Sequence, residues 1–206
     1  MGEHRARRQH QAGRRMMSQL AERSRWPVQS LDDYGRDPHL VAALSPLVRL
    51  RWKVTVTGAE RLPVDTAALL VCNSRRFSLS AVYAALALSD ATSRTVRFVG
   101  RPDIAPLGSL MRRVGALLAH PADVLCALRD GELVLISAAG TADFRHAGEV
   151  PDELLEQAVI AEVPVLPVTT MSSLISRTAR VAVGDAVPAE QVRQDLQRML
   201  DSYGRS

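Results

Sequence analysis

A polar turn between an apolar strand and a helix holds the residues of this chain that could do chemistry. Residues Ala67–Cys72 form an apolar run, the pattern of a strand buried on both faces, and Asn73 ends it. A helical run follows a few residues later. In open α/β sheets, ligands bind where a strand ends in such a turn. The Ser74 hydroxyl and the Arg75 and Arg76 guanidinium groups are therefore the first candidates for contacting a ligand.

The rest of the chain is expected to alternate strands with helices around this turn. Apolar runs and alternating residues predict strands at 52–57, 67–72, 95–99, 132–136, 163–169 and 180–183. Apolar residues at helical spacing predict helices at 80–88, 107–113, 123–129, 151–161 and 188–203. The alternation predicts an α/β fold, with one domain at residues 31–206 and a mostly parallel mixed sheet flanked by helices.

Four blocks between about residues 50 and 168 resemble the glycerolipid (1-acylglycerol-3-phosphate or lysophospholipid) acyltransferase family. That family's turn reads Asn-His, four further residues and Asp, and this chain matches it at Asn73 and Phe77. The other three blocks are similar to 98–117 (FVGRPDIAPLGSLMRRVGAL), 137–142 (SAAGTA) and 163–168 (VPVLPV). The resemblance implies the α/β fold of that family.

Four positions that carry the chemistry of the family hold other residues here. In the family, the His is the general base on the acceptor hydroxyl and the Asp orients it, whereas this chain has Ser74 and Leu79. The family's Glu and Arg that contact the acceptor's phosphate or glycerol are Ala139 and Ala142. A well-placed general base contributes about 10²–10⁴-fold, and a serine hydroxyl accepts no proton near neutral pH. The resemblance therefore implies a scaffold whose catalytic motif is degenerate.

Two histidines are the alternatives for a replacement base. His120 and His146 lie near the second and third blocks, although a lone His without a partner motif is more often a surface residue. Ser74 lacks the Gly-x-Ser-x-Gly elbow of a serine nucleophile. Cys72 ends an apolar run, which favours an unreactive core thiol.

Arginines at these blocks could bind an anionic ligand, because a guanidinium fork binds phosphate through two parallel hydrogen bonds. The resemblance implies that these segments line one face. The candidates for acceptor or phosphate binding are Asn73, Arg75, Arg76, Arg101, Arg112, Arg113, Gly140 and Thr141. The alternative is that Arg is simply the basic residue of this chain, since Lys53 is its only lysine.

The positive charge is concentrated near the N-terminus. Of the formal net charge of +4, residues 1–30 contribute seven arginines against Glu3 and Glu22. This extension is expected to be partly disordered, and a weak amphipathic pattern at 14–26 favours either an anionic membrane surface for residues 1–26 or a solvated tail. Residues 27–38 are expected to be a linker. No motif for binding nucleic acid is visible.

The remaining composition excludes several classes. Cys72 and Cys126 both lie in apolar segments and are expected to be core residues, and the five histidines have no metal-ligand spacing. We therefore expect no metal and no cofactor, and acyl-CoA or acyl carrier protein as co-substrate only in an active enzyme. No run is long enough to span a membrane, which predicts a cytoplasmic protein, either free or peripheral on the inner face of the membrane.

Two functions follow from the sequence. The first is a catalytically inactive acyltransferase-like protein that binds a lipid or membrane surface or a protein partner. The second is an active acyltransferase with an altered catalytic set, which transfers an acyl chain to a lysophospholipid-type acceptor.

Overall fold

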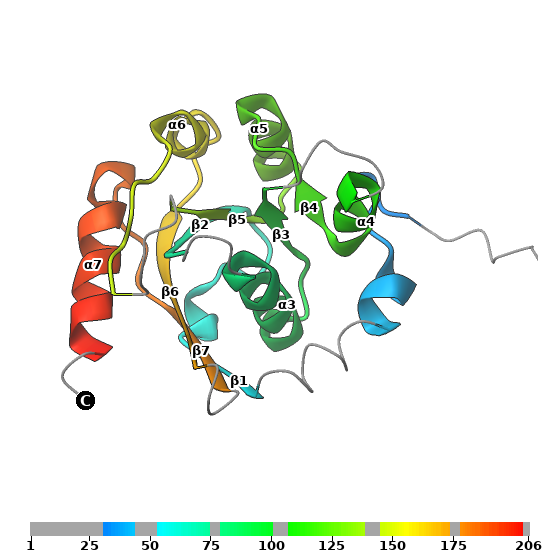
Figure 1. Cartoon of the computed structure of the whole chain (residues 1–206). Helices are drawn as coiled ribbons and strands as arrows, with labels where there is room; N and C mark the ends of the chain where they lie inside the picture. The colour runs from blue at the N-terminus through cyan, green and yellow to red at the C-terminus, as the bar shows by residue number, and fades with distance from the viewer. Residues whose placement is uncertain are drawn as a thin grey trace, which may run out of the picture.

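Seven strands in the described part of the chain form one sheet, in the order β1-β7-β6-β2-β5-β3-β4 (Figure 1). A computed structural model describes residues 31–43, 53–74, 79–100, 107–138, 145–173 and 178–203. The strands are β1 (Lys53–Thr57), β2 (Ala68–Cys72), β3 (Val96–Val99), β4 (Ala116–Leu117), β5 (Leu133–Ser137), β6 (Val165–Ser173) and β7 (Thr178–Val183).

The sheet is mostly parallel, as predicted, with one antiparallel pair. Strands β6 and β7 run in opposite directions, and the other neighbouring strands are parallel. Strands β6, β2, β5, β3 and β4 therefore point the same way. Cys72 at the end of β2 pairs with Val168 on β6 and with Ser137 on β5. The polar turn after β2 consequently lies at the carboxyl edge of the parallel strands.

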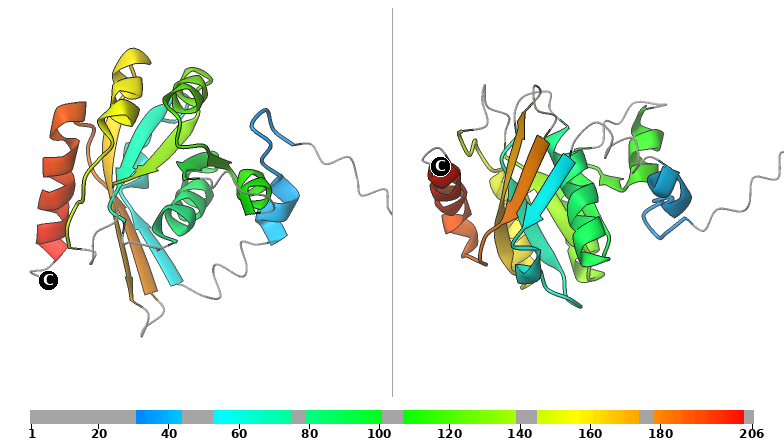
Figure 2. Two further views of the ribbon diagram at one scale, coloured as in Figure 1. Left: turned by 45° about the horizontal axis from the view of Figure 1, so that its top comes forward. Right: turned by 90° about the horizontal axis from the view of Figure 1, so that it is seen from below.

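Helices cover both faces of this sheet (Figure 2). Helix α3 (Ser80–Thr92) packs on one face, and α5 (Pro121–Arg129), α6 (Asp152–Ile160) and α7 (Val192–Tyr203) pack on the other. Helix α4 (Leu107–Val114) contacts β4 at the edge of the sheet. Two short 3₁₀ turns, η1 (Ala59–Arg61) and η2 (Ala189–Gln191), and helical residues at 38–43 complete the described elements.

The central strand β2 is buried on both faces, which confirms the interpretation of its apolar run. Leu70 and Cys72 belong to the core under α3, whereas Leu69 and Val71 belong to the core under α5, α6 and α7. Side chains alternate between the faces of a strand, so a strand covered on both faces needs apolar residues throughout.

The linker prediction for residues 27–38 is wrong for residues 31–38, which pack against the sheet and α4. The Asp37 side chain is fully buried, and its Oδ1 accepts hydrogen bonds from two amides of the helix at 38–43. Its Oδ2 pairs with Arg113 at 2.5 Å. The hydrogen bond from the Arg113 guanidinium is the main reason that the pKa of Asp37 lies below its usual value. A buried charged group therefore helps to hold this segment, together with the packing of Tyr34 on the core.

Arg97 holds the same segment from the middle of β3. Its side chain is 2% exposed, and its Nη2 lies 2.8 Å from both Asp32 Oδ2 and Glu132 Oε1. The Arg97 guanidinium also lies over the Tyr34 ring, 4.3 Å from its centroid. Burial by itself raises the pKa of Asp32, but hydrogen bonds from the Arg36 amide and the Arg97 guanidinium outweigh it and lower that pKa.

The basic extension at 1–30 lies outside the described residues, so its membrane role stays a prediction. Within the described ranges, no helix combines the length and the apolar character needed to cross a membrane.

Candidate functional site

Asn73 fastens the beginning of the candidate turn to β6. Its side chain is fully buried, and its Oδ1 accepts a hydrogen bond from the Thr170 amide at 2.6 Å. Its Nδ2 donates to the Thr170 carbonyl oxygen at 3.0 Å, and the Thr170 hydroxyl donates to the Asn73 carbonyl oxygen at 2.9 Å. The amide group of Asn73 thus continues the pairing of β2 with β6 by one residue beyond the strand. These contacts, which we call the Asn73 lock, fix Asn73 against β6.

The resemblance places the catalytic dyad at positions 74 and 79, close in sequence to Asn73 and its hydrogen bonds with Thr170. Ser74 directly follows Asn73 and is half-buried. Leu79 precedes the first residue of α3, is 57% exposed, and makes no side-chain cap to the helix. No acidic residue lies in the first turn of α3. Neither an imidazole nor a carboxylate therefore stands at these two positions.

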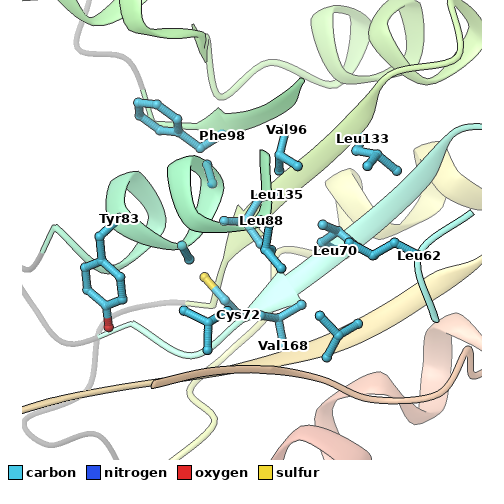
Figure 3. Packing of buried hydrophobic residues seen from close by; sticks show 14 of the residues in the cluster. Leu62, Leu70, Cys72, Tyr83, Leu88, Val96, Phe98, Leu133, Leu135 and Val168 are labelled. Atoms are coloured by element: carbon cyan, nitrogen blue, oxygen red, sulfur yellow. The ribbon is translucent and has the colours of Figure 1, made fainter. Parts of the chain in front are cut away.

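One aromatic side chain of α3 is buried near the end of β2. Tyr83 is 3% exposed and extends from α3 toward the end of β2 (Figure 3). Burial raises the pKa of the Tyr83 phenol, and the nearby hydroxyls of Thr170 and Ser80 oppose this shift. The phenol stays neutral at physiological pH and so supplies no base.

Cys72 is an unreactive core thiol, as expected. It is fully buried, and burial raises its pKa to about 11, although Ser137, whose Oγ lies 3.6 Å from the sulfur, opposes the shift. A thiol is nucleophilic only as the thiolate, which such a pKa disfavours.

The expectation that Cys126 is also a core residue is wrong, because Cys126 is exposed. Each helical residue turns by about 100°, so the inward positions 124, 127 and 128 of α5 leave position 126 facing out.

The two cysteines should differ sharply in reactivity. We expect iodoacetamide at neutral pH to alkylate Cys126 in the native protein and to reach Cys72 only after unfolding, because only Cys126 is accessible. Peptide mass spectrometry after timed labelling measures both. Cys126→Ser provides the control, and rapid labelling of Cys72 in that variant would contradict the burial of this thiol.

The structure places the two candidate replacement bases on other elements. His120 is the N-cap of α5, and its Nδ1 accepts a hydrogen bond from the Ala122 amide at 3.2 Å. It follows β4, which lies three strands from β2, about 14 Å at the usual strand spacing. His146 lines a groove of about 1080 Å³ beside α7. Their role as bases stays a prediction.

The groove beside α7 carries charges of both signs. The Gln197 side chain fixes one wall of it, accepting from the Ala147 amide and donating to the Arg145 carbonyl oxygen, both at 2.9 Å. The charged residues of the lining are Glu149, Glu190, Arg193, Arg198 and Asp201. This mixture gives the groove no preference for an anionic lipid head.

Of the anion-binding candidates, the two arginines of α4 contact the segment before the helix at 38–43. Arg113 pairs with Asp37, and the Arg112 guanidinium packs so closely on Gly35 that a Cβ there would clash with it. The other arginine, glycine and threonine candidates, and two of the degenerate positions, lie outside the described residues: Arg75, Arg76, Arg101, Ala139, Gly140, Thr141 and Ala142. Their roles stay predictions.

Sequence reasoning missed Thr170 and Asp37. Thr170 gave no signal, because an unremarkable strand residue becomes a partner of Asn73 only through the sheet. Asp37 did give one, since an Asp before Pro38 is the pattern of an N-cap followed by Pro at the first helical position.

Comparisons with known proteins agree with this geometry at the level of the fold. The structure superposes on the 1-acyl-sn-glycerophosphate (LPA) acyltransferase PlsC from Thermotoga maritima with a TM-score of 0.62 and 15% identity, covering 82% of this chain and 81% of that one. The predicted acyltransferase-like α/β fold is thereby confirmed.

In sequence, this chain is similar to uncharacterized proteins of mycobacteria. Mb0514 of Mycobacterium bovis and Rv0502 of Mycobacterium tuberculosis are each 30% identical to it over 122 residues. The match covers 54% of this chain but only 34% of either relative, so the chain spans about a third of their length. No family model matches the sequence.

Proposed function

We propose that this chain is a non-catalytic protein on an acyltransferase fold, and that it binds an anionic lipid surface instead of transferring acyl chains. The observation that carries the proposal is the pair Ser74 and Leu79, which flank residues 75–78 at the carboxyl edge of the sheet. The Asn73 lock holds the end of β2 against β6, while a hydroxyl and an exposed isobutyl group stand where a dyad would be needed.

The chemistry of acyl transfer explains why this pair matters. An acceptor hydroxyl attacks the thioester carbonyl, the thiolate leaves, and the hydroxyl proton must move to a base as the new C–O bond forms. Ser74 takes up no proton near neutral pH, and Leu79 can neither orient a base nor stabilise a cation. Tyr83 and Cys72, the nearest buried ionisable groups, have raised pKa values that keep them protonated.

What remains at this edge of the sheet suits binding. Helix α3 begins at this edge without a side-chain cap from Leu79, the positive end of a helix dipole favours an anion, and Arg75 and Arg76 precede the helix in sequence. Seven arginines in residues 1–30 add attraction to anionic lipid, about 1 kcal/mol for each one near the surface. The chain would accordingly act at the inner face of the membrane. A protein partner is the alternative occupant of that role.

The test is thioester turnover by the purified full chain. We expect no release of free thiol above the rate of heat-denatured protein, from acyl-CoA or from acyl carrier protein, with or without lysophosphatidate. The missing base accounts for this result, because its loss alone removes about 10²–10⁴-fold in rate.

Turnover well above background would overturn the proposal in favour of an active acyltransferase with another catalytic set. His120→Ala and His146→Ala then identify the base, because the variant that loses turnover has lost it. Ser74→Ala is the matched control for a contribution of the hydroxyl itself.

A further inference from the structure

Helix α4 carries an apolar stripe that leaves the core at its first turn. Leu107, Leu110, Met111 and Val114 recur at helical spacing on one side of this helix. Val114 is buried and Met111 packs partly against the core under α3, whereas Leu107 is 51% and Leu110 is 44% exposed. Two leucines of one turn therefore present an apolar surface to solvent at the edge of the sheet.

The charges near Leu107 and Leu110 indicate which kind of surface these two leucines could bind. Helix α4 has no acidic residue, and its last turn carries two arginines. Arg113 is paired with Asp37, whereas Arg112 lies beside Gly35 and is exposed, so Arg112 is the relevant cation. Arg112 follows Leu107 by five residues, a rise of about 7 Å along the helix axis. Apolar side chains that enter a membrane interface reach about 5–10 Å below the headgroups, so Arg112 would then lie near the lipid phosphates.

Helix α6 also exposes two apolar side chains, but its charges are opposite in sign to those of α4. On α6, Val159 is 66% and Ile160 is 52% exposed, which is more than either leucine of α4. That helix has no basic residue, and three exposed carboxylates belong to it: Asp152, Glu153 and Glu156. An anionic surface would attract α4 and repel α6, although both expose apolar side chains.

From the exposed leucines, the exposed Arg112 and this contrast with α6, we infer that the first turn of α4 inserts into an anionic lipid surface. The inference rests on the proposed lipid-surface function and names the element that docks. A single weak signal gives only marginal membrane binding, and stable association takes two. Leu107 and Leu110 are the apolar signal, and the arginines of residues 1–30 are the electrostatic one.

The experiment is co-sedimentation of the full chain with vesicles of equal parts phosphatidylcholine and phosphatidylglycerol. The double variant Leu107→Gln with Leu110→Gln should raise the lipid concentration at half-binding at least about tenfold, because each leucine loses its apolar contact with lipid. Gln keeps the helix propensity of Leu, so the fold should be retained. Arg112→Gln should raise that concentration about fivefold.

The matched control is Val159→Gln with Ile160→Gln, which should bind as the wild type does. An α4 variant that binds like the wild type, or an α6 variant that loses as much, would overturn the inference. A wild-type chain that is dimeric in light scattering and becomes monomeric in the α4 variant would also overturn it, because the leucines would then face a second copy.

A fluorescence measurement covers the case of an unstable double variant. Leu107→Trp should add emission that shifts to the blue when these vesicles are added, and Val159→Trp should not. Failure of the wild-type chain to bind vesicles would remove the proposed lipid role together with this inference. Thioester turnover separately decides whether the chain is catalytic.

Discussion

Replacing Arg97 by Met is expected to lower the free energy of unfolding by about 3 kcal/mol, the largest effect that the structure predicts for a single side chain. Met fills a similar volume but leaves the Asp32 and Glu132 carboxylates without their shared cation at 2.8 Å. Breaking a buried ion pair from one side costs about 3–5 kcal/mol. We expect the lower end of this energy range because the side chains of Asp32 and Glu132 are 31% and 24% exposed, so water partly solvates their charges.

Thermal unfolding followed by circular dichroism measures this loss, which should lower Tm by about 6–12 °C in a chain of this size. The control is the triple variant Asp32→Asn, Arg97→Met and Glu132→Gln, in which all three members of the ion-pair cluster are neutral. We expect it to regain a large part of the lost stability. An unchanged Tm in Arg97→Met would show that these ion pairs contribute nothing.

Replacing Asn73 by Ala should cost a similar amount, about 3 kcal/mol, for a different physical reason. The change removes the only side chain that the structure shows bonding both the Thr170 amide and the Thr170 carbonyl oxygen within the described residues. Thr170 is fully buried, so water does not replace these hydrogen bonds. Each buried polar group left unsatisfied costs about 1–3 kcal/mol.

Urea unfolding of Asn73→Ala, with Ser74→Ala as its neighbour control, measures this effect. Ser74 is only half-buried, and its replacement should change stability by less than about 0.5 kcal/mol. Asn73→Asp offers a second comparison. Its carboxylate can accept from the Thr170 amide but cannot donate to the Thr170 carbonyl, so it should also be destabilised. Equal stability of Asn73→Ala and Ser74→Ala would refute the lock.

The hydrogen bonds between Asn73 and Thr170 hold the end of β2 against β6. The hydrogen bonds that join Asn73 to Thr170 on β6 involve neither position 74 nor position 79. The anchoring of this strand end and the chemistry of the dyad positions therefore depend on different residues. This separation supports a protein that keeps the acyltransferase fold and a binding role while its dyad positions hold Ser and Leu.

The exposed leucines of α4 fit the same view. An enzyme on lipid substrates and a lipid-binding protein on the same fold both need contact with a membrane surface. Only the enzyme needs a base. Leu107 and Leu110 would make this contact with the membrane surface, and the contact does not depend on which residues stand at positions 74 and 79.

The sequence by itself determined most of the helices and strands and their order along the chain. The run at 67–72 predicted β2 because a strand covered on both faces needs apolar residues throughout, and helical spacing predicted α7 from Val192, Leu196 and Leu200. It also determined which residues stand at the candidate turn. These properties are local, since each depends on residues within one or two turns of the chain.

Only the tertiary structure decided what the polar residues contact. Asn73 meets Thr170 across 97 residues, and Arg97 meets Asp32 across 65 residues and Glu132 across 35. An isolated Arg in an apolar strand, or an Asp in an apparent linker, carries no local pattern that names its partner. The antiparallel direction of β7 relative to β6 and the existence of the two-residue strand β4 likewise depend on pairing across the sheet. Hydrogen bonds and ion pairs between distant residues exist only once the sheet has brought their elements together, and periodicity along the chain therefore cannot reveal them.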